Sequence, residues 1–127
     1  MRWNWEIFAW DLVSKWNYFE KDTIGKQLVR SADSVAANIS EGFGRFHFKE
    51  NIRFNYIARG SLFETKTWLD KTAKRSLISE EQHNSIIDLI TETAKMLNNY
   101  ISKIGKNITE EPEVPYGVEF PDPFSND

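Results

Sequence analysis

Five polar side chains recur between positions 27 and 41 at intervals of four, three, four and three residues, which places them on one face of a helix. They are Gln27, Ser31, Ser34, Asn38 and Glu41. One hypothesis is a polar site lined by Gln27, Asn38 and Glu41. Arg59 or Ser61 would then face it. The other is a hydrogen-bonded seam that fixes the register of packed helices. General acid–base catalysis needs a base and a second group that orients it, so one glutamate among amides favours the structural seam.

A second constellation mixes aromatic and basic residues around a pair of glycines, over positions 43–49. Arg45, Lys49 and Arg53 lie four residues apart, and positions 30–75 hold nine basic and five acidic residues. Exposed rings stack on unpaired bases and cations contact phosphates, so these three residues are the candidate nucleic-acid-binding residues. The alternative is a solvated helix face with an aromatic staple beneath it. The glycines lack the spacing of a phosphate-binding loop.

Other site chemistries have less support in the sequence. Gly60 and Ser61 lie inside a helical pattern, where a small pair most often lets another helix approach closely, and we predict close helix packing there. The chain has no cysteine and two histidines without partners at metal-ligand spacing, so we expect no metal and no cofactor. A small enzyme using Glu41 and Glu64 is a third hypothesis, which we disfavour.

The elements that position these residues read as four helices, at about 3–18, 22–41, 48–75 and 79–104. Asp22 or Thr23 is the expected N-cap of the second helix. Gly42 and Gly44 are expected to end that helix in left-handed conformations. Ser79 and Gln82 form a predicted capping box, and Gly105 is the expected end of the last helix.

The resulting prediction is an all-α, antiparallel up-down four-helix bundle over residues 1–105, followed by an extended, acidic, Pro-rich tail over 106–127. Residues 105–127 hold six acidic residues and one basic residue, whereas residues 1–104 hold 13 acidic and 15 basic residues. The tail also carries alternating large apolar groups, so we expect it to dock rather than to be fully solvated.

Three further expectations concern the surroundings of the protein. The third helix is apolar on more than one face, which predicts burial by another subunit. No run of about 18 apolar residues is present, so we expect no membrane span. The N-terminal residues lack the basic-then-apolar pattern of a secretory signal, and a cytoplasmic location is the default expectation.

Positions 38–45, read with Ala58, Arg59, Gly60 and Ser61 twenty residues later, resemble the four-helix-bundle family named for proteins encoded by intervening sequences in bacterial 23S rRNA genes. The resemblance covers roughly residues 24–104. It implies an up-down four-helix bundle, a ring-shaped homopentamer and no established enzymatic activity. A related branch is similar to accessory proteins of diversity-generating retroelements, which are thought to hold RNA and a reverse transcriptase.

The functional hypothesis is therefore a non-enzymatic, homo-oligomeric scaffold, with structured RNA or a nucleoprotein such as a reverse transcriptase as its candidate partner. The alternative is a protein–protein interaction module with no nucleic-acid role. Salt-dependent RNA binding would favour the first, because phosphate contacts release counterions.

Overall fold

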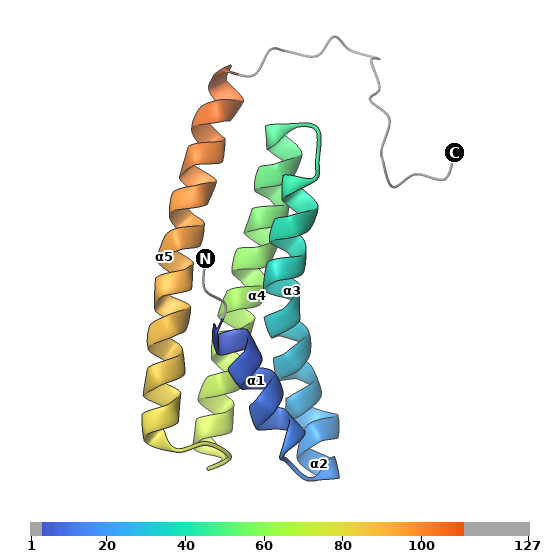
Figure 1. The fold of residues 1–127 in the computed structure, drawn as a ribbon, viewed down its shortest axis with the longest axis vertical. Coiled ribbons are helices and arrows are strands. Elements are labelled where there is room, and N and C mark those ends of the chain that lie inside the picture. Colours follow the sequence, from blue (N-terminus) through green and yellow to red (C-terminus); the bar gives the residue numbers. More distant parts are fainter. Residues whose placement is uncertain (1–3, 111–127) are drawn as a thin grey trace, which may run out of the picture.

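The computed structural model of the chain describes residues 4–110, with the side chains of residues 5–108. Its elements are α1 (Asn4–Ser14), α2 (Tyr18–Glu20), the π-helical turn η1 (Lys21–Gly25), α3 (Lys26–Phe43), α4 (Phe48–Lys74) and α5 (Glu80–Glu110). Successive long helices run in opposite directions along one axis, and the described residues form no strand (Figure 1). The predicted all-α, up-down four-helix bundle is confirmed.

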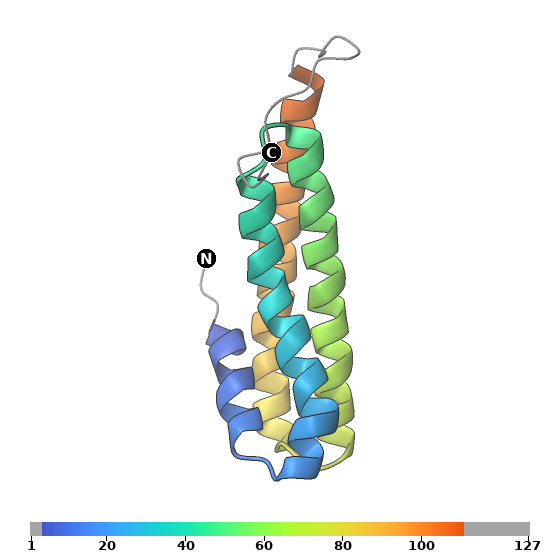
Figure 2. The ribbon, with the colours of Figure 1, turned by 90° about the vertical axis from the view of Figure 1, so that its right-hand side faces the viewer.

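The four helices of the bundle differ in length, so its two ends contain different numbers of helices. Helix α4 packs between α3 and α5, and α1 packs against α3 and α5 from the other side. At 1.5 Å per residue, α1 is about 16 Å long and α5 about 46 Å. Figures 1 and 2 show α1 covering only the end of the bundle where α5 begins. The end that carries the α3–α4 loop is therefore built from three helices.

The core-facing stripe of α4 is half polar. Its buried residues follow each other at intervals of 4-3-4-3-4-3, and they are Asn51, Asn55, Ala58, Leu62, Thr65, Leu69 and Thr72. By contrast, Tyr56, Ile57 and Phe63 are exposed. Several large apolar groups of this helix thus point outward within one copy, while small polar groups share its buried stripe with Leu62 and Leu69.

Helix α1 is anchored by a buried tryptophan. Trp5 is 1% exposed, and its indole N–H donates to the hydroxyl of Thr93 on α5 at 3.0 Å. Ala9 and Val13 continue this buried face. The prediction that the first helix reaches residue 18 is wrong, because α1 ends at Ser14.

The chain enters α3 through a continuous helical run that begins at Tyr18. The predicted N-caps Asp22 and Thr23 are wrong, because the side chain of Asn17 accepts from the backbone N–H of Glu20 instead. The run passes through the π-turn η1 before α3 begins. Thr23 donates its hydroxyl to the carbonyl of Phe19, as an interior helical threonine does.

Gly42 has a different role from the one predicted. It lies inside α3, which ends at Phe43, and its cap Gly44 has a right-handed φ of −77°. A Cβ on Gly42 would lie 2.9 Å from both the carbonyl oxygen of Asn51 and the Cβ of Phe54. Gly42 is thus required by the close approach of α3 to α4, and neither Gly42 nor Gly44 has a left-handed conformation.

Helix α5 begins as predicted and ends later than predicted. Ser79 accepts from the backbone N–H of Gln82 at 3.1 Å, and the Gln82 side chain accepts from the N–H of Ser79 at 3.2 Å, which confirms the capping box. Gly105 does not end the helix, which continues to Glu110. The expected end of the last helix at residue 105 is therefore five residues early. The predicted docking of the tail lies beyond the described residues.

Candidate nucleic-acid interface

The predicted polar seam lies between α3 and α4 and is hydrogen-bonded across them. Thr65 donates to the hydroxyl of Ser31 at 3.0 Å, and the hydroxyls of Ser34 and Ser61 lie 2.9 Å apart. Asn38 donates its amide to both the carbonyl and the hydroxyl of Ser34. These bonds satisfy small polar groups inside a helix pair, which is the structural interpretation of the seam.

The remaining members of the seam do not form a reaction centre. Gln27 is half-buried near the start of α3. Glu41 is paired with Arg45 at 2.7 Å, whereas Arg59 donates to Asn98 on α5 at 3.1 Å. Glu64 accepts from the indole of Trp68 at 3.2 Å. The hypotheses that Glu41 faces Arg59, or works with Glu64, therefore find no geometric support.

Gly60 and Ser61 separate onto different sides of α4. Ser61 bonds to Ser34 across the α3 contact, but a Cβ on Gly60 would meet no described atom within 4 Å. The prediction of close helix packing is therefore wrong for Gly60 within one copy of the chain. The physical reason is rotational: a residue 100° further along a helix faces a different direction.

The loop between α3 and α4 carries exposed aromatic rings at the three-helix end of the bundle. Phe43 and Phe46 are 78% and 70% exposed, and Phe48 begins α4 with 38% exposure. The ring of Phe46 also meets the imidazole of His47 edge-on, with centroids 5.1 Å apart. None of these three rings belongs to the buried core of the described residues, and exposed apolar groups gathered at one place are typical of interaction surfaces.

The three predicted cations do not act as one group. The Arg45 guanidinium lies 2.7 Å from Glu41 and 4.9 Å from the centre of the Phe54 ring, so it ties the loop back onto α3 and α4. Lys49 and Arg53 are exposed one turn apart on α4. Of the three, these two are the cations that the structure leaves exposed, at the same end of the bundle as Phe43 and Phe46.

Two buried amides beneath the loop were missed by the sequence analysis. Asn55 is fully buried and donates to the carbonyl and side-chain oxygens of Asn51, both at 2.8 Å. Asn51 in turn donates to the Tyr100 hydroxyl on α5 at 3.4 Å. The carbonyl oxygen of the Asn55 side chain has no partner among the described residues. The signal was available, because positions 51 and 55 continue the 4-3 spacing of the buried α4 stripe.

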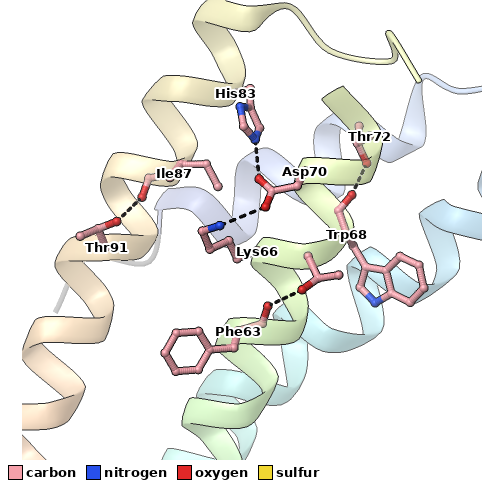
Figure 3. Close-up of polar contacts among 9 residues, drawn as sticks. Phe63, Lys66, Trp68, Asp70, Thr72, His83, Ile87 and Thr91 are labelled. Atoms are coloured by element: carbon pink, nitrogen blue, oxygen red, sulfur yellow. Dashed lines mark hydrogen bonds and ion pairs between the residues drawn. The ribbon is translucent and has the colours of Figure 1, made fainter. Parts of the chain in front are cut away.

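Titratable groups with shifted pKa values lie at the opposite end of the bundle. Burial alone would raise the pKa of Asp70, but hydrogen bonds from Lys66 and His83 outweigh it and lower that pKa below its ordinary value (Figure 3). His83 reaches Asp70 from α5 at 2.8 Å, and Lys66 reaches it along α4 at 3.0 Å. Burial and the neighbouring Asp33 raise the pKa of Glu6 on α1. The His83–Asp70 contact joins α5 to α4, and the Lys66–Asp70 contact lies along α4.

The described part of the chain offers no metal centre, because no group of three or more His, Cys, Asp or Glu side chains there converges on one point. Residues 4–110 also contain no helix that is both long and apolar enough to cross a membrane.

Comparisons with known proteins agree with this architecture. A crystal structure of a protein with unknown function from the S23 ribosomal protein family of Bacteroides thetaiotaomicron is 27% identical to this chain, with a TM-score of 0.69. The match covers 77% of this chain and 92% of that one. Among curated proteins no relative was found. The sequence model of the 23S rRNA-intervening sequence proteins matches residues 4–99. Because that match takes in α1, α3, α4 and most of α5, the chain belongs to the 23S rRNA-intervening sequence protein family.

Proposed function

We propose that the protein is a non-enzymatic, homo-oligomeric scaffold that binds RNA through the loop between α3 and α4. One observation carries the RNA part: Phe43 and Phe46 are largely exposed at the same end of the bundle as the exposed cations Lys49 and Arg53. Rings stack on unpaired bases with about 1–3 kcal/mol each, and cations contact phosphates. A rigid helical platform with this chemistry fits single-stranded segments or loops of a structured RNA.

The short loop supports this proposal by its rigidity. Gly44 donates its N–H to the carbonyl of Ser40 at 3.1 Å, which closes the end of α3. The Arg45–Glu41 pair and the buried amides of Asn51 and Asn55 then hold the first turns of α4 in place. Exposed rings on a preorganised loop lose little conformational entropy when a base stacks on them.

The oligomeric part rests on the outward face of α4. Tyr56, Ile57 and Phe63 are 47%, 43% and 57% exposed, and they surround Gly60, which has open space above it. A glycine flanked by apolar groups allows another helix to approach closely. We infer that α4 packs on a second copy through this face, and the family resemblance suggests a pentameric ring. Sedimentation equilibrium tests this directly: Phe63→Glu should lower the mass of the assembly, and a parent mass near 14.9 kDa at micromolar concentration would contradict it.

The alternative is a protein–protein interaction module, in which the exposed rings of the loop contact a protein partner such as a reverse transcriptase. A substitution of Phe46 separates the two functions. Phe46→Leu keeps an apolar group but removes the ring that stacks on a base. If RNA is bound, its affinity should fall by roughly fivefold or more, in line with about 1–3 kcal/mol for one stacked base.

Fluorescence anisotropy with a labelled RNA that contains a single-stranded loop makes this measurement. Leu89→Ala on α5 is a suitable control, because Leu89 is an exposed apolar group remote from the loop. Equal affinity of the parent and Phe46→Leu for RNA would remove base stacking from the proposal. No RNA binding by the parent at low salt would favour the protein-partner alternative.

A further inference from the structure

An open apolar cleft lies at the opposite end of the molecule from the proposed RNA surface. It has a volume of about 620 Å³ and is formed where the end of α1 meets η1 and the first turns of α3. The residues that line it are Trp10, Val13, Ser14, Lys21, Gly25, Lys26, Val29 and Arg30. The volume falls within the range of about 300–1,000 Å³ that is typical of ligand-binding sites.

The π-turn and Gly25 build this cleft. A Cβ on Gly25 would lie 2.7 Å from Cγ1 of Val13 and 3.3 Å from a ring carbon of Trp16. Only glycine therefore lets the end of α1 approach η1 this closely. One-turn π segments inside helices occur often at functional sites, and this one places Lys21 and Lys26 on the rim of the cleft.

The cleft combines an exposed aromatic ring with a rim of positive charge. Trp10 is 61% exposed although it lines an apolar surface, so a large ring is presented to solvent. Three cations surround that surface. Lys26 has one weak partner, Asp22 at 3.5 Å, and both side chains are exposed. Within residues 4–110 no carboxylate pairs with Lys21 or Arg30, so the rim keeps positive charge.

The C-terminal segment of the chain is both acidic and rich in apolar groups, which complements the basic rim and apolar floor of the cleft. Residues 111–127 contain five acidic residues and no basic residue. Val114, Tyr116, Val118 and Phe120 alternate within it, and Glu113 and Glu119 lie beside them in the sequence. An extended peptide with this alternation presents apolar groups on one side, while its carboxylates can meet a basic rim. We propose that the cleft between α1 and α3 binds this C-terminal segment.

The length of the segment permits this contact. It begins after Glu110, about 46 Å along α5 from Glu80, which lies at the cleft end of the bundle. Seventeen extended residues span at most about 60 Å. About 13 extended residues are needed to cover about 46 Å, so only residues from about position 123 onward, which include Phe124, can reach the cleft of their own copy. The alternating residues 114–120 would bind the cleft of a second copy that lies beside the end of α5.

Paramagnetic broadening in the full-length protein tests the proposal. The chain contains no cysteine, so Ser125→Cys gives a single site for a nitroxide label next to Phe124. The methyl signals of valine and isoleucine then report the position of the label. We expect several-fold greater intensity loss at Val13 and Val29, in or beside the cleft, than at Ile52 and Ile104 near the α3–α4 loop.

Charge reversal supplies the specificity control. In the labelled protein, Lys26→Glu with Arg30→Glu should abolish the broadening at Val13 and Val29. Lys74→Glu with Arg75→Glu, at exposed positions of α4 and the turn that follows it, should leave it unchanged. Chemical shifts of buried methyl groups outside the cleft verify that each variant is folded.

The possible outcomes separate clearly. Broadening that is uniform, or strongest near Ile104 where the segment starts, would overturn the proposal. So would cleft signals that shift with protein concentration but show no broadening from the label, because another surface of a second copy would then fill the cleft. Mixing spin-labelled chains with isotope-labelled chains without the cysteine tells whether the bound segment comes from the same copy, and either result supports its binding.

Discussion

Two glycines make opposite demands on the helices that contain them, and their substitution by alanine should have opposite effects. Gly42 lies in α3 where a Cβ would be 2.8 Å from the side-chain oxygen of Asn51, 2.9 Å from its carbonyl and 2.9 Å from the Cβ of Phe54. Gly60 lies in α4 where a Cβ would meet nothing within 4 Å among the described atoms. The methyl group that alanine adds would therefore press against α4 at position 42 and point into open space at position 60.

The expected magnitudes follow from helix propensity and packing. Alanine is favoured over glycine inside a helix by about 1 kcal/mol, so Gly60→Ala should raise the free energy of unfolding of a single protomer by up to about that amount. In the proposed assembly, the added methyl group would meet the second copy, so the variant should there weaken the contact and lower the mass. Gly42→Ala gains the same propensity, but two of its close contacts are to backbone or Cβ atoms that cannot rotate away. Because those atoms cannot rotate away, the separation of α3 from α4 should cost the upper part of the usual overpacking range, about 2–3 kcal/mol, which leaves a net loss of about 1–2 kcal/mol.

Urea denaturation followed by far-ultraviolet circular dichroism measures both variants against the parent. A Gly42→Ala variant as stable as the parent would refute the close approach of α3 to α4. A Gly60→Ala variant of unchanged mass but lower stability would refute an open outer face of α4. If Gly60→Ala instead lowers the mass of the assembly, then another copy packs against this glycine, as we propose for the oligomer.

Two further substitutions test contacts that join helices. Trp5→Phe removes the indole donor to Thr93 and leaves unfilled volume, so unfolding should become easier by about 2–3 kcal/mol, measured by the same denaturation experiment. Asp70→Asn removes the partner of Lys66 and His83, and should cost no more than about 1 kcal/mol at pH 7 because these side chains are partly exposed. Because the pKa of Asp70 is lowered in the folded protein, the difference in unfolding free energy between the parent and Asp70→Asn is fully present above the ordinary aspartate pKa. It disappears as the pH falls through the folded-state pKa, and a difference that persists in acid would contradict the pairing of Asp70 with Lys66 and His83.

The sequence predicted the helical architecture well because the periodic signals are local. The capping box at Ser79 depends on residues three positions apart, and the structure confirms it. The seam of α3 was also recognisable, because small polar groups at helical spacing need partners. Its partners Ser61 and Thr65 lie about thirty residues away, and only the packing of α4 on α3 identifies them.

The glycines were harder to interpret from sequence. A glycine at a helix end and a glycine that admits a neighbouring helix look alike in a single sequence, and Gly42 was assigned the first role when it has the second. Gly105 has neither role and lies inside α5.

The aromatic residues of α4 were ambiguous for a related reason. Tyr56 and Phe63 are apolar, but the rotation of the helix directs Asn51 and Asn55 to the core and turns these rings outward. Hydrophobicity alone cannot reveal this when polar residues occupy the buried stripe.

The candidate site was only partly predictable. Lys49 and Arg53 share an exposed face as their spacing indicates, whereas Arg45 bends back onto Glu41 and Phe54. A loop residue has no fixed periodicity, so the direction of its side chain depends on tertiary contacts.

The salt dependence of RNA affinity tests the central claim most directly. Each phosphate contact to single-stranded RNA contributes about 0.7 to the slope of log affinity against log salt concentration. Lys49→Glu with Arg53→Glu should reduce that slope by about 1.4 per bound protomer and weaken binding at low salt. Lys74→Glu with Arg75→Glu, which makes the same change in net charge beyond the other end of α4, should leave the slope near that of the parent. RNA binding that is independent of salt, or that falls equally in both variants, would contradict an RNA surface at the α3–α4 loop.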